Sequence, residues 1–272
     1  EFTEDGVHVI HPFHIPEKWP TICSIDIGGD TPWAALTIRC DPLFGDLFIT
    51  NEFYQPNTLT QNLVDWVRDA ERSGIPDPRP FGPCRYVCDP ANKAIMMELM
   101  HRGINCEAAR KGLKNPGIFL VTGYMHPKPG REKLIPDQPG PRGQLRDVVV
   151  NNAPHLWVFK NCENFIREHA QWQWQRDART GLATDKSVDK DDHTVDACIY
   201  GVRVCPPVED LPKSNLSLEA LRKTDFYSYQ EALRVARMKH GDESDKRVGN
   251  EMLVSESGEM DRIYKDTQDK PW

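Results

Sequence analysis

The chain places carboxylates at separated points where a strand is expected to end or a helix to begin. The densest group lies in DKDDHTVDACIYG, residues 189–201, where four aspartates and a histidine fall within eight positions. Asp192, His193 and Asp196 are three and four residues apart, so a helix that starts here would present them on one face. Like charges this close repel one another, and a bound cation would offset the repulsion.

Two further aspartates extend the pattern. Asp26 lies in TICSIDIG, residues 21–28, an apolar run that predicts a buried strand ending in glycine. An ionised carboxylate in such a strand is costly unless it is paired or bound to metal. Asp89 follows the short apolar stretch YVC in the same way. Oxygen-rich clusters suit Mg²⁺ or Mn²⁺, and two such ions about 4 Å apart can activate a water and stabilise the leaving oxygen in phosphodiester cleavage.

Each acidic residue also has a structural explanation. Asp89, which precedes a proline, is a standard helix N-cap. Asp191 or Asp192 could be only a cap or a partner of the helix dipole, and His193 alone is more typical of a surface histidine. Asp196 is harder to explain structurally, because it forms an unfavourable like-charge pair with Asp192 unless a cation is present.

The surrounding sequence predicts the elements that would position these side chains. Three strands linked by short turns read as an antiparallel meander, and strands then alternate with helices. Such an order implies an α/β fold with a mixed central sheet and helices on both faces. The expected strands cover 21–28, 32–41, 46–55, 84–90, 104–112 and 155–160, and the expected helices cover 59–74, 91–103, 161–177 and 191–205.

Composition limits the class of protein. The chain has 272 residues, of which 39% are hydrophobic, and this is enough apolar material for one large core. Its formal charge of −7 is not typical of a nucleic-acid-binding protein. Its eight cysteines form no CxxC pair, so we expect reduced thiols. No signal peptide is visible and no apolar run reaches about 18 residues, so we expect no membrane span.

The two ends of the chain differ from the middle. Residues 1–20 read as a linker, and the absence of an initiator methionine suggests a fragment of something longer. Residues 206–272 read as a polar tail with one helix expected over 229–241. The domain predicted between them covers 21–205.

Four motifs in this order carry a resemblance: SIDIGGDTPWAAL, YVCDPA, ARKG and DKDDHTVDACIYG. Over roughly residues 5–205 the chain resembles the nuclease domain of the large terminase subunit of tailed phages. The resemblance implies an RNase H-like fold. Its central sheet would be mixed and five-stranded, with three antiparallel strands and then parallel ones. Helices would cover both faces, and a hairpin or flap would be inserted.

The resemblance also implies an activity, namely a metal-dependent endonuclease that cuts concatemeric double-stranded DNA by two-metal-ion hydrolysis. The catalytic residues would be Asp26, Asp89 and Asp196. Two Mg²⁺ or Mn²⁺ ions would be held by these three and by His193, with Asp192 as a rival or helper of Asp196. Asp30 matches an auxiliary carboxylate found in part of the family.

Partners follow from the same resemblance. The chain has no GxxxxGK[ST] phosphate loop and hence no expected ATP site, so the packaging ATPase would lie on a missing upstream domain or on another chain. Besides double-stranded DNA, the expected partners are that ATPase domain, the small terminase subunit and the portal ring. The expected setting is the host-cell cytoplasm.

One segment is basic within an acidic chain. Residues 84–146 hold 11 Lys and Arg against 5 Asp and Glu. The alternative is a solvated loop, but the glycines and prolines of 115–143 fit a flap that orders on DNA and covers the acidic cleft. The basic side chains expected to meet phosphates are Arg110, Lys111, Lys114, Lys128, Arg131, Lys133, Arg142 and Arg146.

Three other functions remain open from the sequence. Sugar kinases and actin-like ATPases share the sheet topology, but they need a second phosphate-binding glycine turn that is not seen here. RuvC-like resolvases and transposases of the RNase H-like class share the carboxylates. A non-catalytic module that docks on DNA or on a portal would use the fold without the chemistry. Metal-dependent nicking of plasmid DNA would separate these alternatives.

Overall fold

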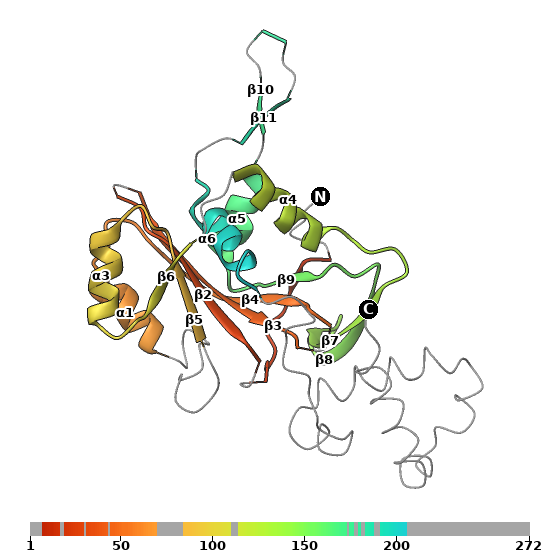
Figure 1. The fold of residues 1–272 in the computed structure, drawn as a ribbon. Coiled ribbons are helices and arrows are strands. Elements are labelled where there is room, and N and C mark those ends of the chain that lie inside the picture. Colours follow the sequence, from red (N-terminus) through yellow and green to blue (C-terminus); the bar gives the residue numbers. More distant parts are fainter. Residues whose placement is uncertain are drawn as a thin grey trace, which may run out of the picture. The chain divides into compact units, whose positions relative to one another are not determined.

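The structure is a computed structural model (Figure 1). It describes residues 7–16, 19–29, 31–42, 44–69, 84–109, 114–172, 174–176, 179–180, 183–187 and 191–205. The predicted tail over 206–272, and with it the helix expected at 229–241, lies outside the described residues.

A mixed seven-stranded sheet forms the centre of the fold, in the order β1-β9-β4-β3-β2-β5-β6. β2, β3 and β4 pair antiparallel, whereas β5 and β6 continue parallel to β2, and β9 runs parallel to both β4 and β1. The strands are β1 (Val9–Ile10), β2 (Thr21–Asp26), β3 (Trp33–Cys40), β4 (Leu47–Gln55), β5 (Cys84–Cys88), β6 (Cys106–Ala108) and β9 (Leu156–Phe159).

The mixed α/β fold is confirmed, and the sheet is larger than the five strands expected. β9 matches the strand expected at 155–160, whereas β1 was not expected, and both strands extend the sheet beyond β4. β1 comes from the segment predicted to be a linker, and Ile10, Phe13 and Trp19 from that segment are buried. Phe13 packs edge-on against Phe48 of β4, with ring centroids 5.7 Å apart. This apolar packing, rather than a regular period, holds the segment on the domain.

Helices cover both faces of the sheet (Figure 1). α1 (Thr60–Arg68) and α3 (Lys93–His101) lie on one face, and α4 (Lys114–Met125), α5 (Glu163–Gln171) and α6 (His193–Val202) lie on the other. Leu63 and Val64 of α1 share a buried cluster with Cys23 and Ile25 of β2. Because side chains alternate along a strand, Asp26 points to the opposite face, which carries α6.

Gly201 allows α6 to approach the sheet closely. A Cβ at this position would lie 2.5 Å from Cδ1 of Ile38 and 2.8 Å from Oγ of Ser24, too near for any side chain. The contact fixes α6 against β2 and β3, so the start of the helix lies over the end of β2 where Asp26 is found.

The segment predicted to be an insertion or long loop is more regular than expected. Besides the expected hairpin, formed by β7 (Glu132–Pro139) and β8 (Leu145–Asn151), it contains helix α4. Ile118, Val121 and Met125 of α4 are buried, spaced by three and four residues as on one helical face. Gly117 brings α4 against α6, since a Cβ there would lie 2.4 Å from Cγ2 of Ile199.

A buried ionic network anchors the β7–β8 hairpin to the turn between β3 and β4. The Lys133 ammonium, which is fully buried, lies 3.0 Å from Oδ2 of Asp41 and 2.8 Å from Oδ2 of Asp46. Arg131 and His155 contact Oδ1 of Asp46 at 2.5 and 2.9 Å. Burial alone would raise the pKa of Asp46, but Lys133, the hydrogen bond from His155 and Arg131 hold that pKa at about 2.

A second hairpin, β10 (Trp174–Arg176) and β11 (Ala183–Ser187), joins α5 to the segment before α6. None of the helices in the described ranges combines the length and apolar character that a bilayer crossing requires.

Candidate active site

Asp26 is the centre of the acidic site. It is the last residue of β2 and is 7% exposed. His193 is the first residue of α6, and its Nδ1 lies 3.3 Å from Oδ2 of Asp26. This hydrogen bond is the main reason that the pKa of His193 is raised, against a smaller opposing effect of burial. The end of β2 and the start of α6 are therefore joined by the hydrogen bond between His193 and Asp26.

Asp89 lies beside Asp26 on the neighbouring strand. Ile25 of β2 is in register with Cys88 of β5, and the Asp89 N–H donates to the carbonyl of Ile25 at 3.0 Å. The N-cap explanation of Asp89 is wrong, because Asn92 caps α3 by accepting from the Ile95 N–H. Asp89 instead accepts the Ala91 N–H in the turn that leaves β5.

Asp192 and Asp196 come from the start of α6. Asp192 occupies the N-cap position and is 5% exposed, yet its side chain makes no capping hydrogen bond. Glu168 of α5 takes that role, accepting the Thr194 N–H at 2.8 Å and its hydroxyl at 2.5 Å. Asp196 is half-buried one turn into the helix. The start of α6 is therefore capped from another helix, and capping does not explain the Asp192 carboxylate.

The charges of these carboxylates affect the pKa values of their neighbours. Burial raises the pKa of Asp26, His193 lowers it, and the charges of Asp89 and Asp192 raise it again. Burial also raises the pKa of Tyr200 on α6, and the charges of Asp26, Asp196 and Asp89 add to that rise. Tyr200 is therefore a further ionisable group whose pKa depends on the three carboxylates that the sequence singled out.

The donor types fit a divalent cation, but the side chains do not enclose one as they stand. Carboxylate oxygens are the ligands that Mg²⁺ and Mn²⁺ prefer. Within the described ranges, no group of three or more His, Cys, Asp or Glu side chains is arranged to hold a metal ion. One oxygen of Asp26 is turned to His193, and Oδ1 of Asp89 accepts the Ala91 N–H. Each of these contacts uses one oxygen of its carboxylate.

Several predicted site residues fall elsewhere. Asp30, Arg110 and Lys111 lie outside the described residues, as does the side chain of Lys114. Arg142 and Arg146 are exposed on the β7–β8 hairpin, and Lys128 is half-buried with its ammonium donating to the Gly123 carbonyl.

Lys133 and Arg131 need correction as phosphate contacts. Lys133 is fully buried between two aspartates, so no phosphate can reach its ammonium in this structure. Arg131 is 18% exposed and donates to Asp46 and to the carbonyls of Ala153 and Pro154. Both side chains hold the hairpin in place.

The hairpin also lies at the wrong end of the sheet to cover the carboxylates. Thr21 is in register with Arg39 and Asp26 with Ala34, so the β3–β4 turn that anchors the hairpin lies at the Thr21 end of β2. A strand of six residues spans about 17 Å. Figure 1 shows β7 and β8 away from the start of α6. The prediction that segment 115–143 covers the acidic cleft is not supported by this anchoring.

Comparison with solved structures shows that the mixed α/β fold is shared with large terminases of bacteriophages. The large terminase of a thermophilic bacteriophage superposes with a TM-score of 0.54 at 18% identity, over 75% of this chain and 44% of that protein. The chain thus spans less than half of that protein's length, and the shared feature is the fold.

Two nuclease domains superpose less closely. That of the large terminase of bacteriophage SPP1, crystallised with bound Mn, gives a TM-score of 0.48 at 19% identity, over 68% of this chain and 85% of that one. The P22 large terminase nuclease domain gives 0.49 at 16% identity, over 76% and 93%. No protein-family model and no curated protein matches the sequence.

Sequence reasoning missed Glu168 and Tyr200. Glu168 lies on the buried face of α5 with Phe165 and Ile166, and a carboxylate on an apolar helical face was a visible signal. Tyr200 is four residues after Asp196, on the same face of α6, and the spacing was equally readable.

Proposed function

We propose that this chain is a divalent-metal-dependent endonuclease that cuts double-stranded DNA during viral genome packaging. One observation carries the proposal: Asp26, Asp89 and the first turn of α6 converge at one end of an RNase H-like sheet. Isolated buried carboxylates are costly, and their grouping is best explained by a cation that offsets their charge. The fold shared with the large terminase of the thermophilic phage supports the packaging context.

The residues take distinct roles in this proposal. Asp26, Asp89 and Asp196 would hold Mg²⁺ or Mn²⁺, with Asp192 and His193 completing the set. Bound there, two such ions would supply an activated water and charge for the leaving oxygen. Glu168 orients the start of α6 through Thr194, and His193 holds Asp26 in position. Asp30 remains an auxiliary candidate.

Partners and setting are proposed on the same basis. The chain would act beside a packaging ATPase, with the small terminase subunit and the portal ring, in the host-cell cytoplasm. Arg142 and Arg146, exposed on the hairpin, together with Arg110, Lys111 and Lys114, remain the proposed phosphate contacts. With few base-reading groups expected, binding would depend on salt more than on sequence.

The proposal predicts that the chain nicks closed circular plasmid DNA in Mn²⁺ or Mg²⁺ and not in EDTA. Conversion to open circular and linear forms, followed on agarose gels, checks it. Because the ions supply the nucleophile and stabilise the leaving group, cleavage should depend on metal concentration and saturate. Cleavage that persists in EDTA, or binding of DNA with no cleavage at any Mn²⁺ concentration, would contradict the proposal and favour a docking module.

A further inference from the structure

Strand β4 extends beyond the strand that covers its outer edge. β9 pairs with β4 only from Leu47 to Ile49, whereas β4 continues to Gln55. In the part of the chain that the structure describes, no strand pairs with the outer side of residues 52–55. Open strand edges present backbone groups that can pair with another chain.

The backbone direction along this edge can be assigned from one side-chain contact. Nδ2 of Asn161 donates to the carbonyl of Thr50 at 2.9 Å, so this carbonyl points outward from the sheet. Thr50 lies at the register shift between β3 and β4, and the regular strand resumes after it. Beyond the bulge the strand alternates regularly again, and we take Glu52 and Tyr54 as the residues that present their backbone groups to the open side.

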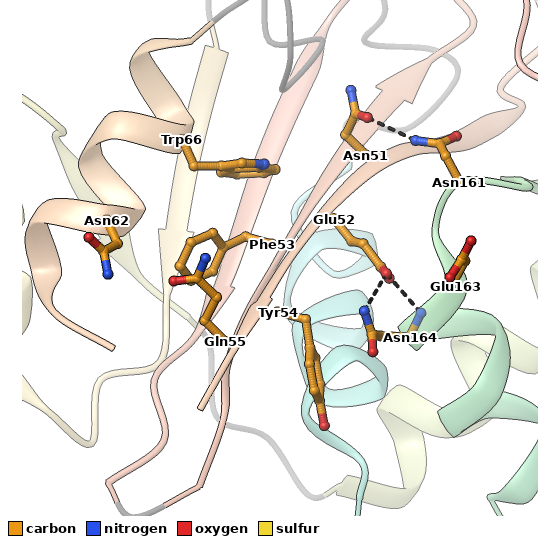
Figure 2. A pocket seen from close by; sticks show the side chains of 10 residues that line it. All are labelled: Asn51, Glu52, Phe53, Tyr54, Gln55, Asn62, Trp66, Asn161, Glu163 and Asn164. Carbon is orange, nitrogen blue, oxygen red and sulfur yellow. Dashed lines mark hydrogen bonds between the residues drawn. The ribbon is translucent and has the colours of Figure 1, made fainter. Parts of the chain in front are cut away.

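A notch of about 460 Å³ opens beside this edge, between α1 and the start of α5. Figure 2 shows Trp66 and Asn62 of α1 on one side of β4 and Glu163 and Asn164 of α5 on the other. Two aromatic residues that line the notch pack against each other, since the ring centroids of Trp66 and Phe53 lie 5.8 Å apart.

The notch is amide-rich and negatively charged. Five of its ten lining residues are Asn or Gln, two are glutamates and none is Lys or Arg. Glu52 is held in place, since it accepts the Asn164 and Phe165 N–H groups, each at 2.8 Å. Glu163 is exposed and lines the notch. Arg167 lies at the margin of the notch, with its guanidinium 5.4 Å from the centre of the Tyr54 ring. The negative charge available to a ligand is therefore that of Glu163, where a cationic side chain would meet a complementary charge.

We propose that the open edge of β4 and the notch beside it bind an extended, basic peptide segment of a protein partner. The segment adds a strand to β4 through the backbone of Glu52 and Tyr54 and places a lysine or arginine against Glu163. Strand addition takes affinity from the main chain and specificity from side-chain pockets. The inference does not depend on the nuclease activity.

The test uses a probe peptide, acetyl-Thr-Lys-Val-Lys-Val-Thr-amide, and its counterpart with both lysines replaced by glutamate. Titration of the full chain, followed by amide chemical shifts in NMR, should give saturable shifts centred on residues 52–55 and 161–164 with the lysine peptide alone. Raised salt should weaken the binding.

Variants make the test specific. Glu163→Lys should weaken the lysine peptide at least about fivefold, as for reversal of a partly exposed ion pair. Tyr54→Pro should abolish binding, because proline removes the outward N–H and is tolerated on an edge strand. Asp147→Lys, an equal charge change at an exposed site on β8, should leave affinity unchanged.

Four results would overturn the proposal. They are the absence of saturable shifts at the edge, equal binding of the glutamate peptide, unchanged affinity in Glu163→Lys, and shifts at these residues produced by a single-stranded oligonucleotide or by self-association instead of the peptide.

Discussion

Asp26→Asn is expected to lower DNA cleavage in Mn²⁺ at least about a thousandfold, as loss of a central catalytic group does. The substitution keeps the shape of the side chain and removes the charge that ligation requires. Burial and the charges of Asp89 and Asp192 raise the pKa of Asp26, so the ionised carboxylate of Asp26 is unfavourable in the folded protein. The neutral asparagine should therefore not lower the free energy of unfolding. Plasmid nicking rates and melting temperatures, measured on the same preparations, check both halves of the prediction.

A matched control shows whether the effect is specific to the position of Asp26 or follows from the loss of any aspartate. Asp65 is exposed on α1, where it accepts a hydrogen bond from Gln61, so Asp65→Asn should cleave at the wild-type rate. If Asp26→Asn cleaves within about tenfold of wild type while folding normally, the assignment of Asp26 as the central ligand is wrong.

Lys133→Met is expected to destabilise the domain by about 3–5 kcal/mol, the range for removing one partner of a buried ion pair. Two aspartates would remain buried with less compensation, and methionine fills similar volume without a charge. For a domain of this size each kcal/mol shifts the melting temperature by roughly 2–4 °C. Chemical denaturation and thermal melting measure the loss.

Two further variants test whether the loss of stability in Lys133→Met is caused by the buried charges. Lys160 is exposed at the end of β9, and Lys160→Met should change stability by less than about 0.5 kcal/mol. Adding Asp46→Asn to Lys133→Met should recover part of the loss, because it removes one of the uncompensated charges. An unchanged melting temperature in Lys133→Met would mean that the network contributes nothing to stability.

The sequence predicts the elements that carry the acidic residues better than it predicts the periphery of the fold. The positions of Asp26, Asp89 and Asp196 at the end of β2, just after β5 and in the first turn of α6 could be predicted, because strand ends and helix starts are marked locally by apolar runs and by proline. The register that brings Asp26 beside Asp89 follows from the parallel pairing of two consecutive strands after the meander. Local patterns therefore carry most of the proposed site.

Partners distant in the chain could not be predicted in this way. Lys133 lies two residues before the buried Ile135 on β7, so both side chains point to the same face, which indicates an inward lysine. Its aspartates, however, lie 92 and 87 residues earlier in the chain. A lysine in a basic segment was therefore interpreted as a phosphate contact. α4 overlaps the segment 115–143, which was predicted to be a flap because of its glycines and prolines, although the buried residues of the helix keep a helical spacing.

The most direct test of the proposed metal site is a crystal soaked in Mn²⁺ and measured at a wavelength where manganese scatters anomalously. We expect peaks beside Asp26, with Asp89 and the start of α6 as the other protein ligands at about 2.0–2.2 Å. We also expect the side chain of Asp26 to turn from His193 to reach the ion. A crystal that binds Mn²⁺ elsewhere, with no peak at Asp26, would contradict the proposed site.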